Sequence, residues 1–235
     1  RDEIDSLDAS LVELLNRRAE LAQEVGRVKG RDGKPFFTPE RERAIYARVG
    51  ELNQGPLQTR QLTGIFREVI SAARAAETPL TCACWGPAGT FSHSAALQAF
   101  GHSAEVQFHD SITDVFLAVE HNKANYGVVP VENSVAGVVP ETLDAFPLTN
   151  VKICAEVYLH VHHHLAGAAP SLEAVERVYA GPQPAAQCRR WLQANLPGRE
   201  MIEAAPTARA AEYAKNDPAG VAIVNRMGAD VVGIP

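Results

Sequence analysis

Residues 1–30 of the chain read RDEIDSLDASLVELLNRRAELAQEVGRVKG, with apolar side chains at steps of three and four residues. These apolar positions are Ile4, Leu7, Leu11, Leu14, Leu21, Val25 and Val28. The spacing predicts a helix from about Asp2 to Lys29 whose apolar stripe packs against other helices. Position 18 interrupts the stripe with Arg18. Because a buried guanidinium needs an anion nearby, we expect a carboxylate of the protein or of a ligand inside a helical bundle.

Two shorter helices are expected after the first one. A break at residues 30–35 precedes Thr38–Glu40, which is typical of an N-cap, a first-turn proline and a first-turn acid, and this helix ends near Asn53. A third helix is expected from about Thr59 to Ala76. At ~42 Å the first helix is too long to be covered by two shorter helices of its own chain. The sequence therefore predicts an intertwined helical homodimer.

The composition is that of a globular protein with an acidic balance of charge. The chain has 235 residues, of which 46% are apolar, and a net charge of −6. Nucleic acid and membrane are not expected as partners, because both favour a basic surface and no apolar run approaches the ~20 residues of a membrane span. The cysteines are Cys82, Cys84, Cys154 and Cys188. They lack the spacing of a disulfide framework, which favours reduced thiols in a cytoplasmic protein.

The sequence pattern changes after Glu77-Thr78-Pro79. Short apolar strands then alternate with helices, which is typical of an α/β fold. The expected strands are Cys82–Trp85, Tyr126–Val131, Val151–Val161, Val175–Ala180, Met201–Ala204 and Val221–Val224. The expected helices are Ser92–Phe100, Ser111–His121, Ala185–Ala194 and Ala208–Lys215. We therefore expect an all-α, three-helix domain at 1–77, a linker at 78–80 and an α/β domain at 81–235.

Six charged residues of the helical part are candidate site residues: Arg1, Arg18, Lys29, Arg41, Glu42 and Glu77. Lys29 follows Arg18 by three helical turns, so both lie on one face, ~16 Å apart. Arg1 lies ~25 Å from Arg18 along the same helix and reaches it only from a second copy. The set lacks a nucleophile, a metal-ligand cluster and a phosphate loop, and suits a dianionic substrate that needs orientation and charge stabilisation. Arg41 and Glu42, taken singly, are more typical of solvated residues.

The helical part resembles the all-helical, AroQ-type chorismate mutase domain over residues 1–77. The resemblance is carried by Arg1–Asp5 with Leu7-Asp8, Leu14–Arg18, Glu24–Lys29, Pro39–Glu42 and Ile65–Ile70. It implies a site shared across a dimer, in which chorismate rearranges to prephenate by an intramolecular Claisen reaction. It also implies that Arg18, Arg41 and Arg1 of the neighbouring copy bind carboxylates or orient the substrate.

The same resemblance implies roles for the remaining charged residues. It implies that Lys29 and Glu77 contact the ether oxygen, where negative charge develops, and that Glu42 binds the substrate hydroxyl. Many members of the family have Gln at the position of Glu77, and a carboxyl group there must be protonated to donate a hydrogen bond. We therefore expect a mutase that loses rate as the pH rises through the pKa of this carboxyl. Ala73 stands where some members have Ser, so that hydrogen bond to a carboxylate is absent.

Two polar turns stand out in the α/β part. Gly86–Ser92 follows a strand and opens a helix, so its backbone and the hydroxyls of Thr90 and Ser92 offer donors to a carboxylate. The turn lacks the lysine of a Walker loop and the third glycine of a dinucleotide fingerprint. Val129–Ser134 ends a strand with three polar residues, at the edge where open α/β sheets bind ligands, although a plain turn explains it equally.

Residues 81 to about 230 resemble prephenate dehydratase. The resemblance is carried by Trp85–Ser92, Tyr126–Ser134, Pro182–Cys188 and Pro206–Ala211. It implies two α/β lobes around a cleft, like a periplasmic binding protein, and conversion of prephenate to phenylpyruvate with loss of water and carbon dioxide. The cleft-lining catalytic residues that it implies are Thr90, Ser92, Glu132, Asn133, Ser134, Gln187 and Thr207. No cofactor is expected, and the implied pathway is phenylalanine biosynthesis.

The chain departs from the dehydratase pattern in several places. Ala180-Gly181 replaces the usual Ser-His, and Pro184 replaces the Ala that usually follows Gln183. The chain also ends at Pro235, before the Thr-Arg-Phe motif that supplies a catalytic threonine in the family and before its phenylalanine-sensing ACT domain. We therefore expect mutase activity and little dehydratase activity from the chain as given.

Two other functions stay open. The helices could form a dimerisation module fused to a two-lobed domain that senses a small carboxylate without chemistry, or the α/β part could be a regulatory remnant of a mutase. Arg18 argues against the first alternative, because leucine there would stabilise a pure dimer seam. His160, His162 and His164 share one face of an expected strand. No metal is expected there, since no Cys or carboxylate is spaced to complete a site.

Overall fold

The computed structural model describes residues 1–31 and 37–235, with only the backbone of residues 28–31. The described chain forms two compact units. The first unit contains Arg1–Cys82, Leu97–Glu105 and Lys152–Glu156, and the second contains Ala83–Ala96, Val106–Val151 and Val157–Pro235. The predicted break at 30–35 falls mostly outside the described residues. Of the helices within the described residues, none has the length and hydropathy of a membrane span.

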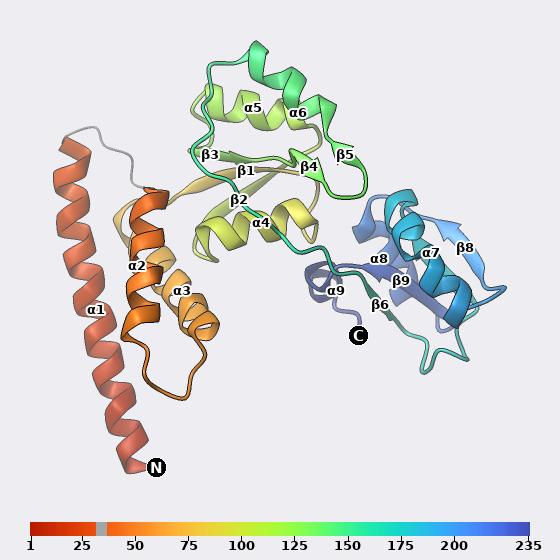
Figure 1. The fold of residues 1–235 in the computed structure, drawn as a ribbon, viewed down its shortest axis with the longest axis horizontal. Helices are drawn as coiled ribbons and strands as arrows, with labels where there is room; N and C mark the ends of the chain where they lie inside the picture. Colours follow the sequence, from red (N-terminus) through yellow and green to blue (C-terminus); the bar gives the residue numbers. More distant parts are fainter. Residues whose placement is uncertain (32–36) are drawn as a thin grey trace. The chain divides into compact units, whose positions relative to one another are not determined.

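Three helices build the first unit, and they confirm the predicted ones. They are α1 (Asp2–Arg31), α2 (Pro39–Leu52) and α3 (Thr59–Glu77). Helix α3 contacts both α1 and α2 (Figure 1). Local sequence fixes the helix starts: Pro39 occupies the first turn of α2, and Gln58 with Gln61 forms a reciprocal capping box at α3.

The apolar stripe of α1 is uncovered in the single chain. Its six residues with described side chains are between 46% and 65% exposed: Ile4, Leu7, Leu11, Leu14, Leu21 and Val25. Arg18 in the middle of the stripe is half-buried. A row of exposed apolar side chains of this length is rare on a monomer and marks an interaction surface.

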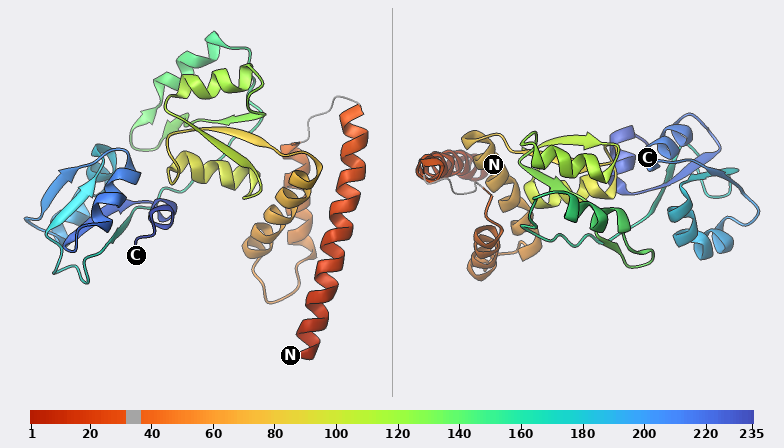
Figure 2. Two further views of the ribbon diagram at one scale, coloured as in Figure 1. Left: turned by 180° about the vertical axis from the view of Figure 1, so that it is seen from behind. Right: turned by 90° about the horizontal axis from the view of Figure 1, so that it is seen from above.

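A small three-stranded sheet in the order β2-β1-β3 and the hairpin β4-β5 follow along the chain, mostly within the second unit. The strands are β1 (Thr81–Trp85), β2 (Glu105–His109), β3 (Tyr126–Val128), β4 (Glu132–Asn133) and β5 (Gly137–Val138). The helices around them are α4 (Phe91–Phe100), α5 (Ile112–Glu120), α6 (Pro140–Ala145) and the 3-10 helix η1 (Phe146–Leu148). Helices α4 and α5 lie on opposite sides of the sheet (Figures 1 and 2). Cys82 and Cys84 are fully buried in β1.

A second sheet of four strands follows in the order β6-β9-β7-β8. Its strands are β6 (His164–Gly167), β7 (Arg177–Ala180), β8 (Glu200–Glu203) and β9 (Gly220–Val224), with helices α7 (Pro182–Asn195), α8 (Thr207–Lys215) and α9 (Arg226–Val232). Strands β7, β8 and β9 are parallel, and β6 pairs antiparallel with β9. The alanines of α8 pack on one face of this sheet, and Leu192 of α7 packs on the other. The sheet is therefore buried on both sides.

The predicted strand at 151–161 is wrong. Residues 151–163 form no regular secondary structure, and β6 begins only at His164, where it pairs with Val224 of β9. Because β9 is five residues long, it offers hydrogen bonds to no more than a short stretch of the crossing segment. Ile153 and Tyr158 are 74% and 77% exposed, so their apolar character did not indicate a sheet.

Because residues 151–163 form no strand, His160, His162 and His164 do not share the strand face that was predicted for them. His160 and His162 precede β6, and their ring centroids are 6.4 Å apart. In the part of the chain that the structure describes, no three His, Cys, Asp or Glu side chains gather closely enough to hold a metal ion. The predicted strand Tyr126–Val131 is also shorter, because β3 ends before Pro130, which has no N–H to donate.

Substitution of Gly101 by Ala is expected to destabilise the first unit. Gly101 follows α4 with φ +74°, and a Cβ there would overlap the side chain of Ser71 on α3. Gly198 has φ +73° but open space around it, so Gly198→Ala is the matched control. Both variants should lose ~1–2 kcal/mol for the left-handed backbone, and Gly101→Ala about 1–3 kcal/mol more for the overlap. Urea unfolding measures the difference, and equal losses would contradict the Ser71 contact.

Candidate active sites

The end of α3 lies against α1 at Gly26. Gly26 is buried, and a Cβ added to it would overlap the carboxyl group of Glu77. The side chain of Gln23 donates to the backbone oxygen of Ala76 at 2.9 Å, which ties the same two helices together one turn earlier. Glu77 therefore lies within one turn of position 29, although the side chain of Lys29 falls outside the described residues.

Glu42 occupies a charged cluster between α2 and α3. Its Oε1 accepts a hydrogen bond from Nη2 of Arg74 at 2.8 Å, and its Oε2 accepts one from the Tyr46 hydroxyl at 3.2 Å. The side chains of Arg74 and Glu42 are only 8% and 12% exposed. The guanidinium of Arg74 also lies over the ring of Phe37, with its Cζ 5.1 Å from the ring centroid.

The electrostatics of this cluster follow from its burial. Burial raises the pKa of the Glu42 carboxyl above its usual range, while Arg74 opposes that rise, helped by Tyr46 and Arg67. Burial and the neighbouring Glu42 carboxylate together raise the pKa of Tyr46 to about 12. Tyr46 is therefore a permanent hydrogen-bond donor at neutral pH, and Glu42 is the group whose charge responds to its neighbours.

The other predicted residues of the helical part are spread along the chain. Arg1 is exposed immediately before α1, Arg18 is half-buried in the middle of α1, and Arg41 is exposed beside Glu42 on α2. A single chain does not bring Arg1 to Arg18, because seventeen residues of one helix separate them by ~25 Å. The single chain therefore holds a partial set, with Glu77 at Gly26 and Glu42 at Arg74.

Arg74 is part of the cluster, although it was not among the residues predicted from the sequence. Ile70, Ala73, Arg74 and Glu77 follow the i, i+3, i+4, i+7 spacing of a buried helix face, and all but Glu77 are buried. The signal is the one that drew attention to Arg18, namely a cation at an apolar position.

In the second unit, the turn Gly86–Ser92 caps helix α4. The Thr90 hydroxyl accepts a hydrogen bond from the backbone N–H of His93 at 3.2 Å, and the Thr90 carbonyl accepts one from Ser94 at 3.0 Å. Ser92 is half-buried in the first turn of α4. Thr90 and Ser92 thus lie at a helix N-terminus, where backbone dipoles favour an anion.

The polar turn after β3 has a structural role in the hairpin. The side-chain oxygen of Asn133 accepts hydrogen bonds from the backbone N–H groups of Val135 at 2.9 Å and Ala136 at 3.1 Å. Glu132 and Ser134 on either side are exposed. The side chain of Asn133 therefore holds its own turn in place and positions its two neighbours.

Gln187 contacts His163, which was not among the predicted site residues. Its Oε1 lies 2.5 Å from Nε2 of His163, and the His163 ring is edge-on to the ring of Phe91 at 5.7 Å between centroids. His163 thereby connects the Gly86–Ser92 turn with α7. Thr207, the first residue of α8, is half-buried. Nothing in the sequence around His163 distinguishes it from the three neighbouring histidines.

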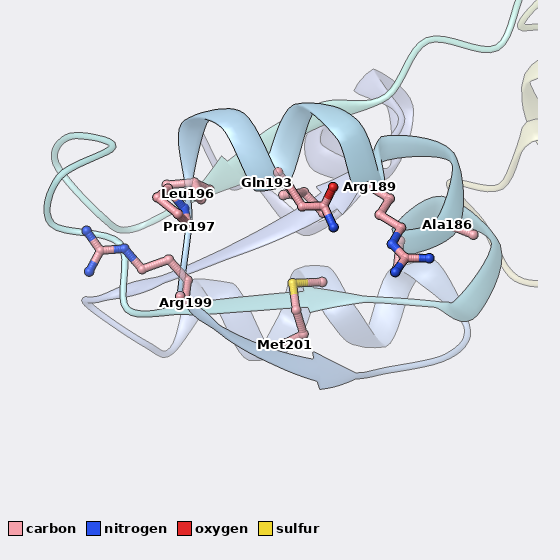
Figure 3. A pocket seen from close by; sticks show the side chains of 10 residues that line it. Ala186, Arg189, Gln193, Leu196, Pro197, Arg199 and Met201 are labelled. Atoms are coloured by element: carbon pink, nitrogen blue, oxygen red, sulfur yellow. The ribbon is translucent and has the colours of Figure 1, made fainter.

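A separate groove runs between α7 and β8. Figure 3 shows Arg189 and Arg199 at its two ends, with Gln193 and Met201 between them. Nη2 of Arg199 donates to the carbonyl oxygen of Glu173 at 3.2 Å. None of the predicted site residues lines this groove, so it is distinct from the dehydratase-type residue set.

Two family models match the chain one after the other. The first, chorismate mutase type II, matches residues 1–78, and the second, prephenate dehydratase, matches residues 82–235. The chain therefore combines an all-helical region with an α/β enzyme domain that follows it. This confirms the predicted fold class. The chain belongs to the prephenate dehydratase family and carries a chorismate mutase type II region at its N-terminus.

Curated relatives combine the same two regions. Proteins named bifunctional chorismate mutase/prephenate dehydratase from Aquifex aeolicus and Pseudomonas aeruginosa are 42% and 41% identical to this chain, each over 97% of it and 64% of the relative. The protein of that name from Escherichia coli K12 is 32% identical over 82% of this chain and 54% of its own length. The chain spans 64–66% of the length of the first four curated relatives that it matches.

Solved structures resemble the α/β part. Prephenate dehydratase from Arthrobacter aurescens, in complex with L-Phe, superposes with a TM-score of 0.58 and 29% identity over 65% of this chain and 52% of that one. GqqA, described as a novel type of quorum quenching acylase, gives a TM-score of 0.59 and 26% identity over 66% of this chain and 57% of that one.

Proposed function

We propose that the helical region isomerises chorismate to prephenate and that the α/β region binds prephenate and converts it to phenylpyruvate, two successive steps of phenylalanine biosynthesis. The observation that carries this proposal is the order of the two family matches along one chain. The product of the first reaction is the substrate of the second. The domains that we propose are residues 1–77 and 81–235, joined by a linker at 78–80.

The proposed mutase site joins residues from two copies of the chain. Arg18 and Arg41 bind the substrate carboxylates together with Arg1 of a second copy. Lys29 and Glu77 stabilise the ether oxygen as its bond to carbon breaks, and Glu42 orients the substrate hydroxyl. The reaction is intramolecular, so holding the substrate in its chair-like form and stabilising the developing charge lower the barrier without a covalent intermediate.

The homodimer is part of the same proposal, and the uncovered stripe of α1 supports it. Six apolar side chains of the stripe are about half exposed or more. They contribute the free energy of apolar burial only when a partner helix covers them. The geometry of Arg1 supports it as well, since only a second copy brings this residue to Arg18. We also propose a cytoplasmic location, because four cysteines without framework spacing suit a reducing compartment.

For the α/β region we propose that Thr90, Ser92, Glu132, Ser134, Gln187 and Thr207 contact prephenate and that Asn133 holds the turn between its neighbours. Recognition then relies on hydroxyls, amides and a helix N-terminus. Aromatisation of the ring drives loss of carbon dioxide and hydroxide, so the site needs to orient the carboxylate and assist the leaving group.

The test separates the two regions. Purified chain is given chorismate, and both chorismate and prephenate are followed by chromatography. Consumption with stoichiometric formation of prephenate supports the mutase, whereas unchanged chorismate in the presence of folded dimer refutes it. Prephenate binding is measured separately by the fluorescence of Trp85 in β1 and Trp191 on α7. Absence of a saturable change, confirmed by calorimetry, would refute prephenate binding by the α/β region.

Glu77→Gln is expected to remove the loss of mutase rate at high pH. Because only a protonated carboxyl group donates a hydrogen bond to the ether oxygen, wild-type kcat/KM should fall about tenfold per pH unit above the pKa of that group. A glutamine amide donates at every pH, so the variant should keep its rate. Rates measured between about pH 5 and 9 check this. A flat wild-type profile would remove Glu77 from this role.

A further inference from the structure

Arg74 is a buried cation of the helical region, whereas Arg18 is half-buried. It is 8% exposed on the face of α3 that also carries Ile70 and Ala73. An apolar residue at such a position would pack without any desolvation cost. A cation retained there needs a reason, and its contacts indicate one.

The contacts of Arg74 fix both the position and the direction of its guanidinium group. One face lies over Phe37, which is 6% exposed and packs in turn on Phe100 with 4.9 Å between ring centroids. One edge donates to Oε1 of Glu42 at 2.8 Å. With its face stacked and its edge bonded, the guanidinium has little freedom, and neither has the carboxyl group that it holds.

The charges around Glu42 come from two helices. From α3, Arg74 is in direct contact, and Arg67 acts at longer range. From α2 itself, the hydroxyl of Tyr46 donates to Oε2 at 3.2 Å. Tyr46 and Arg74 therefore bind one oxygen each. A carboxylate oxygen has two acceptor sites, so each oxygen of Glu42 keeps capacity for one further hydrogen bond from a ligand.

We propose that Arg74 is a positioning residue of the mutase site, which keeps the Glu42 carboxylate charged and oriented to accept a hydrogen bond from the substrate hydroxyl. This role rests on the proposed mutase function. Arg74 itself does not touch the substrate in this role. It acts through Glu42, and Phe37 and Phe100 keep it in place.

The proposal has a specific consequence for the pH profile. Burial raises the pKa of Glu42 and Arg74 opposes that rise, so removing Arg74 raises this pKa further. Glu42 would then be protonated over more of the acid range and would stop accepting the hydrogen bond. The acid limb of kcat/KM should move upward by about 1–3 pH units, the usual effect of an arginine on an adjacent carboxyl group.

The experiment compares Arg74→Met, Arg74→Lys and the control Arg60→Met in the full chain, with kcat and KM measured from pH 4 to 9. Arg60 lies on the same helix but is exposed. We expect Arg74→Met to shift the acid limb upward, Arg74→Lys to restore most of the wild-type profile, and Arg60→Met to match wild type. In the background of Glu42→Gln, which has no carboxyl group to titrate, Arg74→Met should not shift the limb.

The outcomes distinguish the possible failures. A folded Arg74→Met variant whose acid limb coincides with that of wild type overturns the positioning role, as does an equal shift in the Glu42→Gln background. If Arg74→Met does not fold, the profile of Arg74→Lys decides: a limb within the wild-type range supports retention through charge, and complete loss of rate at every pH refutes it. A wild-type chain without mutase activity refutes the proposed function itself.

Discussion

Arg18→Ala is expected to lower kcat/KM for chorismate by about 10²–10³-fold, the usual cost of removing one preorganised group that stabilises charge at a reacting centre. The variant should fold at least as well as wild type, because Arg18 interrupts an apolar stripe and its removal relieves a desolvation cost. Loss of activity without loss of stability indicates that the substituted residue is functional. Substitution of a structural residue lowers both the activity and the stability of the protein.

A mixing experiment turns this loss into a test of the shared site. Arg1→Ala should also be nearly inactive, since Arg1 is proposed to serve the site of the other copy. In a mixed dimer of the two variants, one site has both wild-type arginines and the other has neither. After complete exchange half of the dimers are mixed, so roughly a quarter of all sites are intact. An equal mixture should therefore recover about a quarter of the wild-type rate.

The control for this experiment is exchange of chains. Differently tagged copies that co-purify after mixing show that mixed dimers have formed. If they form and the rate does not recover, Arg1 and Arg18 do not meet across copies, and the stripe of α1 serves assembly alone. Recovery beyond the quarter would mean that mixed dimers form in preference to the parent dimers, because sites with a single arginine are already measured in each variant alone.

The helices of the first unit follow from local sequence. The predicted and observed ends of α1 and α3 agree within two residues, because a stripe of spacing three and four, first-turn acids and a capping box all act locally. The strands of the α/β part are harder to predict from local sequence. Strand β2 lies at a sheet edge and reads Glu-Val-Gln-Phe-His. This alternation of polar and apolar residues is typical of a half-buried strand, but the predicted strands were apolar runs and did not include it.

The candidate sites also contain residues that local sequence predicts and residues that it does not. Sequence motifs select Glu42 and Gln187 because the resemblance carries them. Their partners, Arg74 and His163, depend on packing between segments 32 and 24 residues apart, which no local pattern contains. The uncovered stripe is a third case, since the length of α1 already predicts a partner helix, while the identity of that helix depends on assembly.

Gly26→Ala is expected to abolish most mutase activity while leaving the helix intact. A methyl group at position 26 would overlap the carboxyl group of Glu77, so Glu77 must leave its place against α1. Displacement of a catalytic group by even 1 Å costs about 10²-fold in rate. Alanine is also a better helix former than glycine by up to ~1 kcal/mol, so α1 itself should not be weakened.

Gly64→Ala is the matched control, because Gly64 lies inside α3 and an added Cβ meets no atom within 4 Å. It should raise stability by a similar ~1 kcal/mol and leave the rate unchanged. Circular dichroism and chorismate turnover on the two variants give both readouts. Normal turnover by Gly26→Ala would show that Glu77 works equally well away from α1. The site at the end of α3 would then not depend on the close approach of the two helices. The combination of full helix content and lost turnover, in this variant alone, ties the chemistry to the place where the side chain of Glu77 lies against Gly26 of α1.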